Sequence, residues 1–124
     1  MHSKLKDLTK AEEQVMQHLW TLEKGFVKDI LARMPEPKPA YNTVSTIVRI
    51  LEEKGFVGHT AYGKTYQYFP LVSKEDYSKF TATNLLSNYF NGSVKELVSF
   101  FVKEKEIDMS DLDEILKSMN KSEE

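Results

Sequence analysis

The sequence contains no cysteine, and this absence excludes several kinds of chemistry. Without thiols the chain has no disulfide, no thiolate zinc finger, no iron–sulfur ligation and no cysteine nucleophile. Its three histidines, His2, His18 and His59, are spaced too widely to predict a set of metal ligands. We therefore expect neither a metal nor a cofactor.

Long apolar runs are also absent. No stretch approaches the roughly eighteen apolar residues of a membrane helix, and the N-terminal segment lacks the apolar core of a signal peptide. We therefore expect no membrane insertion and a cytoplasmic location. The sequence also has no nucleophile elbow, Walker motif, dinucleotide fingerprint or paired-histidine zinc motif, so we expect that the protein is not an enzyme.

The sequence also has no excess of positive charge, because its net charge is −2. A protein that binds nucleic acid over a uniformly basic surface usually carries such an excess. The charges are nevertheless unevenly distributed. Residues 1–72 carry ten Lys and Arg against eight Asp and Glu, whereas residues 73–124 carry seven against eleven. This asymmetry indicates that the first region meets an anion through a local surface and that the second region has a different task.

Helical periodicity and a hairpin pattern define the first region. Thr9 and Glu12 form a capping box at a helix start, and Gly25 ends the apolar stripe that follows. The predicted helices cover residues 10–24, 27–34 and 41–54. From Phe56 to Leu71 the pattern becomes extended around a glycine turn at residues 62–65. Three short helices followed by a hairpin are typical of a winged helix-turn-helix.

The second region is predicted to hold three more helices. Ser73, Ser93 and Ser110 each precede an acidic residue by three positions, which is the pattern of a helix N-cap. About fifty residues in three amphipathic helices make a thin core, so their large apolar side chains need a partner surface. Self-association is the simplest partner. The predicted dimer interface comprises Tyr77, Phe80, Leu85, Leu86, Tyr89, Phe90, Leu97, Val98, Phe101, Leu112, Ile115 and Leu116.

The third helix carries an unusual polar face. Asn42, Ser45, Thr46 and Arg49 recur at helical spacing opposite an apolar stripe. Solvated helix faces are usually rich in Glu and Lys, whereas Asn and Arg contact purine edges and Ser and Thr contact phosphates or thymine methyl groups. An ordinary solvated face is the alternative interpretation. The predicted DNA-binding residues are Asn42, Thr43, Ser45, Thr46 and Arg49 on this helix, and Tyr62, Gly63 and Lys64 at the hairpin tip.

Sequence motifs at residues 41–57, 62–70 and 89–92 are similar to those of a known family, and the similarity extends over nearly the whole chain. With these motifs the chain resembles the penicillinase repressors of the BlaI/MecI type, a family of bacterial winged-helix transcriptional repressors. The resemblance implies a homodimer that binds a dyad-symmetric, double-stranded DNA operator. It also implies release when a membrane sensor with a cytoplasmic metalloprotease activity triggers cleavage of the repressor.

Two departures from the family pattern affect the inducing signal. The family's cleaved bond joins Asn to Phe in the helix after an Asn-Gly break, and the matching stretch here reads Val98-Ser99-Phe100-Phe101. Phe100 therefore replaces the Asn, and the corresponding cleavage site is Phe100-Phe101. The copper-responsive branch carries C-terminal cysteines, which this chain lacks, so copper sensing by that route is excluded.

We therefore expect a mainly α fold with a small β-hairpin. A winged-helix DNA-binding domain would span residues 1–72, and a helical dimerisation region would span residues 73–124. The alternative is a winged-helix protein-interaction module without specific DNA binding, which the overall acidity favours. Salt dependence separates the two, because DNA binding releases phosphate counterions and weakens steeply as salt rises.

Overall fold

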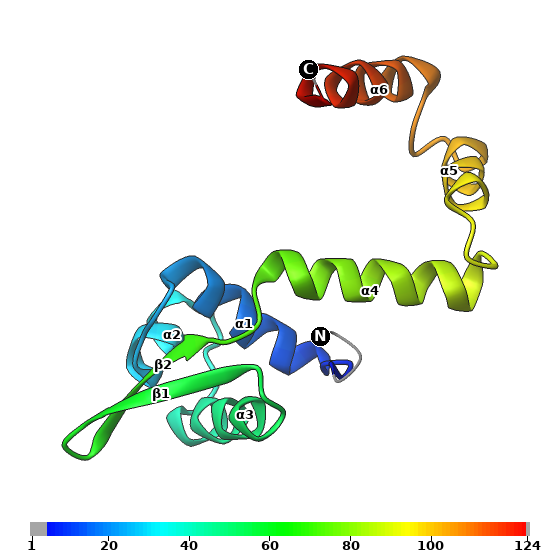
Figure 1. The fold of residues 1–124 in the computed structure, drawn as a ribbon. Helices are drawn as coiled ribbons and strands as arrows, with labels where there is room; N and C mark the ends of the chain where they lie inside the picture. The colour runs from blue at the N-terminus through cyan, green and yellow to red at the C-terminus, as the bar shows by residue number, and fades with distance from the viewer. Residues whose placement is uncertain (1–4, 124) are drawn as a thin grey trace. The chain divides into compact units, whose positions relative to one another are not determined.

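The computed structural model describes residues 5–123, and it describes the side chains of residues 5–119. It divides the chain into two compact units, Met1–Thr81 and Ala82–Glu124. The elements are α1 (Lys10–Leu22), α2 (Val27–Arg33), α3 (Tyr41–Glu53), β1 (Val57–Tyr62), β2 (Thr65–Pro70), α4 (Lys74–Tyr89), α5 (Val94–Lys103) and α6 (Met109–Glu123) (Figure 1). Among the described residues, no helix is both long and apolar enough to cross a lipid bilayer.

The first unit is a bundle of three helices with an antiparallel hairpin beside it. β1 and β2 pair in a register that sets His59 opposite Tyr68 and Tyr62 opposite Thr65. The loop between α1 and α2 extends this small sheet, because Gly25 and Tyr68 exchange backbone hydrogen bonds of 2.9 and 2.8 Å. Three short helices and a hairpin in this order form the expected winged helix-turn-helix.

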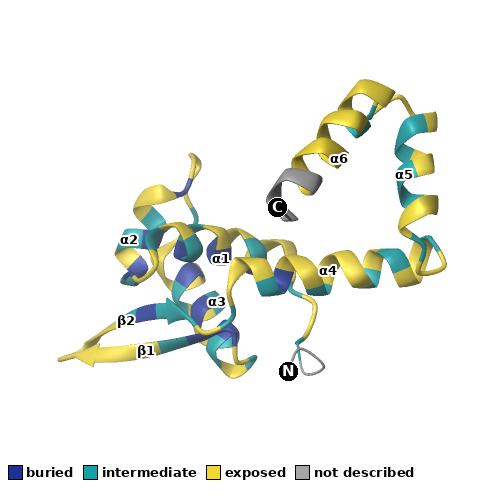
Figure 2. Cartoon of the chain, turned by 45° about the horizontal axis from the view of Figure 1, so that its top comes forward, coloured by how far each residue is buried: buried dark blue, intermediate teal, exposed yellow. Residues whose placement is uncertain are grey.

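One apolar core holds the first unit together. Each helix contributes the residues on one face, at the spacing of 3.6 residues per turn, and the hairpin contributes its base. Figure 2 accordingly shows the dark, buried positions within α1 to α3 and at the base of the hairpin, while the outer half of the hairpin is exposed. The buried core residues are Val15, Met16, Leu19, Val27, Ile30, Met34, Val44, Val48, Leu51, Phe56, Val57, Tyr68 and Tyr77.

The start of α4 belongs to this core. Tyr77 is 6% exposed and packs edge-to-face on Phe56, with 5.5 Å between the ring centroids. Its hydroxyl accepts a hydrogen bond of 3.0 Å from the Leu8 backbone N–H, and the Trp20 indole donates to the Val72 carbonyl at 2.9 Å. The first compact unit therefore continues beyond residue 72, the boundary expected from sequence, to Thr81.

The predicted helix caps are confirmed at three positions and wrong at two. The Glu12 backbone N–H donates to the Thr9 hydroxyl, and the Ser73 and Ser93 hydroxyls accept from Asp76 and Glu96. The end of α1 differs from the prediction, because the left-handed residue there is Glu23, with φ of 71°, while Gly25 pairs with β2. Ser110 does not cap α6: the Asp108 carboxylate accepts from the Asp111 N–H at 2.9 Å and the helix begins at Met109.

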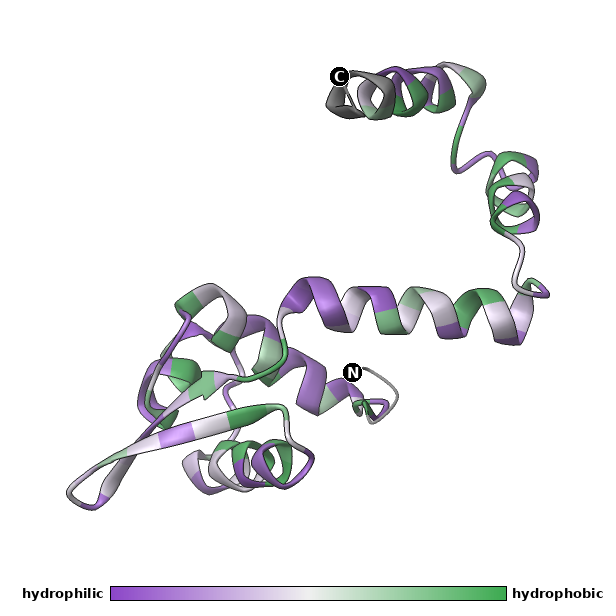
Figure 3. Ribbon diagram, viewed as in Figure 1, coloured by the Kyte–Doolittle hydropathy of each residue, from purple (hydrophilic) through white to green (hydrophobic). Residues whose placement is uncertain are grey.

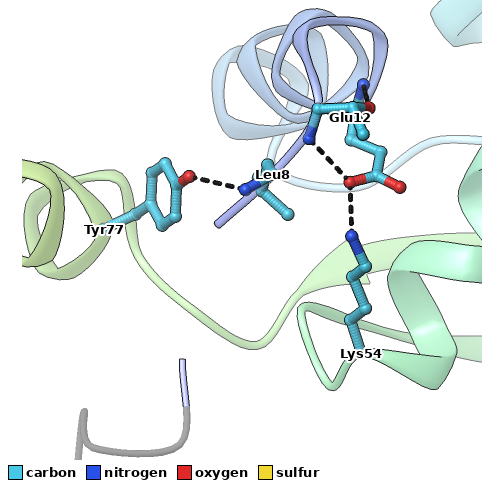
Figure 4. Close-up of polar contacts among 5 residues, drawn as sticks. Leu8, Glu12, Lys54 and Tyr77 are labelled. Carbon is cyan, nitrogen blue, oxygen red and sulfur yellow. Dashed lines mark hydrogen bonds and ion pairs between the residues drawn. The ribbon is translucent and has the colours of Figure 1, made fainter. Parts of the chain in front are cut away.

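Glu12 links the start of α1 to the end of α3. Its carboxylate accepts from the Thr9 N–H at 2.9 Å and from the Lys54 ammonium at 2.7 Å (Figure 4). Burial by itself raises the pKa of Glu12, but the hydrogen bonds from Lys54 and Thr9 outweigh it, so the pKa lies below its ordinary value of 4.5. The ionised carboxylate therefore stabilises the fold.

We expect Glu12→Gln to lower the free energy of unfolding by about 1–3 kcal/mol at pH 7, because it removes the charge from a buried, charge-assisted pair. A carboxylate whose pKa is lowered by folding stabilises the protein above its unfolded pKa, and this effect is lost as the pH falls through the folded pKa. The difference between wild type and variant should therefore shrink below about pH 4. Urea unfolding at pH 7 and pH 3.5 measures it, and an equal difference at both values would contradict the assignment.

Candidate nucleic-acid interface

The predicted polar face of α3 is present and faces away from the core. Val44, Val48 and Leu51 are fully buried on one side of the helix. Of the predicted contact residues on the other side, Ser45 is half-buried and the exposed ones are Asn42, Thr43, Thr46 and Arg49. This exposed face is short, polar and carries a single charge, which suits contact with base edges in a DNA major groove.

The hairpin forms a wing with an exposed tip. Gly63 has a φ of 62°, the conformation that glycine provides at the first position of a two-residue hairpin loop. The Thr65 hydroxyl donates to the Tyr62 carbonyl at 2.9 Å and closes the turn. Tyr62, Gly63 and Lys64 are all exposed, and the Tyr62 ring lies edge-on to Phe26 at 5.9 Å.

A groove of about 490 Å³ separates α3 from the wing. It brings together three of the predicted residues, Ser45, Arg49 and Lys64, whereas Asn42, Thr43, Thr46, Tyr62 and Gly63 lie outside its lining. Its remaining lining residues are Phe26, Val27, Lys28, Tyr41, Thr65, Tyr66 and Tyr68. Each of α2, α3 and the wing contributes one cation, and these cations are Lys28, Arg49 and Lys64.

Lys28 and Tyr41 are groove residues that sequence reasoning missed. A lone lysine at the start of a short helix carries no motif, and the closeness of Lys28 to the wing depends on tertiary packing. Tyr41 precedes the polar stripe of α3, and nothing in the sequence distinguishes it from an ordinary aromatic residue at the surface. Its side chain is half-exposed. Only their position along the chain could have pointed to Lys28 and Tyr41, because each lies in the first turn of a helix of the helix-turn-helix.

The groove is electrostatically suited to an anion. Among residues 5–119, Lys28, Arg49 and Lys64 make no direct ion pair with a carboxylate, so their charged groups are available to an anionic ligand. Burial, with a smaller contribution from the Glu52 charge, raises the pKa of Tyr68 at the groove floor. Its phenol therefore stays neutral, and the groove gains no negative charge of its own.

The predicted dimer-interface residues fall into two groups. Tyr77 is buried in the core of the first unit and Phe80 packs against that core, so both are used within one chain, in contrast to the expectation for Tyr77. The others lie in the second unit, where the described side chains include no buried residue. The half-buried residues of this group are Leu86, Phe90, Leu97, Val98, Phe101 and Leu112. The exposed residues are Leu85, Tyr89, Ile115 and Leu116.

The helix α5 has the clearest apolar face of the second unit, seen as green segments in Figure 3. Phe90 and Phe100 pack edge-on with 5.6 Å between their ring centroids, and Phe100 and Phe101 are separated by the same distance. Phe100 is nevertheless 47% exposed. The candidate cleavage bond Phe100-Phe101 thus lies inside a helix whose apolar side chains are only partly covered by the chain itself.

Comparison with known proteins identifies the family. A family model described as penicillinase repressor matches residues 8–121. The chain belongs to the penicillinase repressor family. The resemblance inferred from the motifs at residues 41–57, 62–70 and 89–92 is thereby confirmed.

Individual relatives in the penicillinase repressor family match over most of their length. The methicillin resistance regulatory protein MecI of Staphylococcus aureus (strain N315) is 25% identical over 122 residues, which are 98% of this chain and 99% of that protein. The penicillinase repressor of Bacillus licheniformis is 20% identical over 113 residues, or 90% of this chain and 88% of that protein. The solution structure of the DNA-binding domain of the repressor BlaI matches with a TM-score of 0.52 and 22% identity, covering 59% of this chain and 90% of that one. This last match confirms the winged-helix fold.

Proposed function

We propose that the protein is a transcriptional repressor that binds a dyad-symmetric DNA operator as a homodimer. The observation that carries this proposal is the groove between α3 and the wing, which Lys28, Arg49 and Lys64 line from three different elements. The groove adjoins the polar face of α3. Membership of a repressor family adds independent support.

The geometry suggests a division of labour between base contacts and phosphate contacts. With α3 in the major groove, Arg49 would donate two hydrogen bonds to a guanine and Asn42 would pair with an adenine edge. Ser45, Thr43 and Thr46 are short enough to let the helix approach the bases. Lys64, with Tyr62 and Gly63 at the wing tip, would contact the phosphate backbone, as would Lys28.

The second unit supplies the proposed dimer interface. Its apolar side chains at residues 85–116 include no fully buried member, so a single chain leaves much of their surface in water. A second copy covers such a surface in the simplest closed arrangement, with two-fold symmetry. Two α3 helices related by that symmetry would contact two half-sites of a palindromic operator.

The proposal is tested by selecting binding sites from a pool of random duplexes and then measuring affinity as a function of salt. A repressor should enrich a palindromic sequence and lose affinity steeply with salt, because phosphate contacts release counterions. A winged-helix module that binds only proteins should enrich no duplex at any salt concentration. The second outcome would overturn the proposal.

We expect Arg49→Ala to weaken binding to the selected duplex by about 1–3 kcal/mol and to relax the preference at one base pair, because a bidentate guanidinium contact discriminates in that range. Lys64→Ala is the matched comparison. It should weaken binding to all duplexes alike and reduce the salt slope by about one unit. Repeating the selection with each variant measures both effects, and an unchanged preference with Arg49→Ala would remove Arg49 from the base-reading residues.

Release from DNA is proposed to follow cleavage at Phe100-Phe101, initiated by a membrane sensor-protease. The cut would separate α6, with Leu112, Ile115 and Leu116, from the rest of the chain and so weaken the dimer. A peptide bond inside a helix is a poor substrate until that helix opens locally. The protease must therefore bind and unwind α5, or capture it while it is transiently open.

We expect repressor from induced cells to contain a fragment that ends near Phe100. Mass spectrometry of the protein recovered before and after induction measures this, with Phe100→Asn, which introduces the family's Asn-Phe pair, as the comparison. That variant should be cut at the same bond. Intact 124-residue protein accompanying full derepression would contradict proteolytic release and would favour release by a bound ligand.

A further inference from the structure

The wing is joined to α3 by a side-chain contact that involves none of the predicted DNA-binding residues. His59 of β1 and Glu52 in the last turn of α3 lie 2.6 Å apart between Nδ1 and Oε2. Both side chains are about one-third exposed, at 31% and 33%. An imidazole N–H that donates to a carboxylate forms a short, charge-assisted hydrogen bond, and this bond strengthens when the imidazole is protonated.

The His59 ring also connects this contact to the groove. The ring stacks on Tyr66 with 4.2 Å between centroids and 13° between planes. Tyr66 in turn lines the groove, on the side opposite Arg49 and Ser45 of α3. A continuous set of contacts therefore runs from Glu52 through His59 to the wing wall of the groove.

Side-chain contacts rather than core packing hold the outer wing in place: besides the contact between His59 and Glu52, the Tyr62 ring at the tip lies edge-on to Phe26 at 5.9 Å. In β1 only Val57 is buried and Gly58 is half-buried, while every residue from His59 to Tyr62 is exposed. In β2 the buried residue is Tyr68, and Thr65 and Tyr66 are exposed. Core packing thus secures the base of the hairpin, and the position of its outer half relative to α3 depends on contacts such as the one between His59 and Glu52.

We infer that His59 is a positioning residue for DNA binding, which holds the wing at the distance from α3 that lets Lys64 and Arg49 engage one duplex together. This inference rests on the proposed function. The groups facing His59 are Glu52 from α3, and Tyr66 and Tyr68 from β2.

The test compares two substitutions that each remove a different contact of His59. His59→Phe keeps an aromatic ring against Tyr66 and loses the donor, whereas His59→Asn places an amide N–H near the position of Nδ1 and loses the ring. We expect His59→Phe to weaken binding to the selected duplex about tenfold, the effect of losing one charge-assisted hydrogen bond. His59→Asn should stay within about threefold of wild type, because it keeps a donor for Glu52.

Controls separate this inference from the proposed function. His18→Gln removes an imidazole from α1, outside the groove lining, and should leave the affinity unchanged. Hydrogen exchange in the free protein reports the wing without DNA: amides of residues 60–67 should exchange faster in His59→Phe, and those of α1 should not. If His59→Phe fails to fold, Glu52→Ala takes its place, because it removes the acceptor and should weaken binding to the same extent.

The outcomes are distinguishable. Wild type that selects no duplex would overturn the proposed function. Wild type that selects a duplex, while His59→Phe binds it with the wild-type affinity and shows the wild-type exchange rates at residues 60–67, would overturn the positioning role alone.

Discussion

A chain that ends at Thr81 is expected to remain folded and to bind the palindromic duplex at least about a hundredfold more weakly than the full chain. The compact unit Met1–Thr81 contains the whole buried core, including Tyr77. It lacks the apolar residues of the second unit, so it should be a monomer. Without a linked partner each half-site is bound separately, and the gain from simultaneous engagement, about 10²–10⁴-fold, is lost.

Sedimentation and fluorescence anisotropy on both chains measure this loss. A duplex that carries one half-site is the control, because the two chains should bind it with similar affinity. A chain cut after Val72 provides a second comparison: it removes Tyr77 from its contacts with Leu8 and Phe56 and should unfold at a lower temperature than the chain cut after Thr81. Full-length protein that sediments as a monomer at micromolar concentration would contradict the dimer.

The second large effect is expected from Phe56→Ala, which should lower the free energy of unfolding by about 3–5 kcal/mol. Phe56 is fully buried, and its ring is the edge-to-face partner of Tyr77. Truncation to alanine leaves a cavity where α3, the wing and the start of α4 meet. Because small domains are stable by only about 5–15 kcal/mol in total, the variant should be close to unfolding at 37 °C.

Urea unfolding followed by far-ultraviolet circular dichroism checks this prediction. Tyr62→Ala serves as the matched control, since it removes a large aromatic ring that is 55% exposed at the wing tip. Its effect should be within about 1 kcal/mol. A loss of less than 1 kcal/mol with Phe56→Ala would mean that the surrounding side chains can refill the cavity.

Local signals in the sequence predicted most of the fold. The capping box at Thr9 and Glu12, the period of α3 and the glycine turn at Gly63 each depend on residues within a few positions of one another. The predicted cap at Ser110 failed for a related reason. Asp108, two residues earlier, also offers an acceptor, and its carboxylate binds the Ser110 hydroxyl as well as the Asp111 N–H.

Features that depend on distant residues were beyond sequence reasoning. An apolar stripe in α4 gives no sign of which residues face the first unit, so Tyr77 could not be told apart from residues such as Tyr89, which is 75% exposed. Lys28 and Tyr41 become groove residues only once α2, α3 and the wing have packed together. The contact between His59 and Glu52 likewise joins two elements through a register that hydrophobic patterns do not specify.

The convergence of three cations on one groove has a consequence at the scale of a chromosome. Nonspecific affinity for DNA grows with the number of phosphates that a protein neutralises, and here Lys28, Arg49 and Lys64 converge in a chain of net charge −2. Such a protein should spend little time on random sequence, so most unbound copies would diffuse freely rather than slide along the genome. Operator occupancy would then track the concentration of the repressor closely, and a modest fall in that concentration would be enough to start transcription.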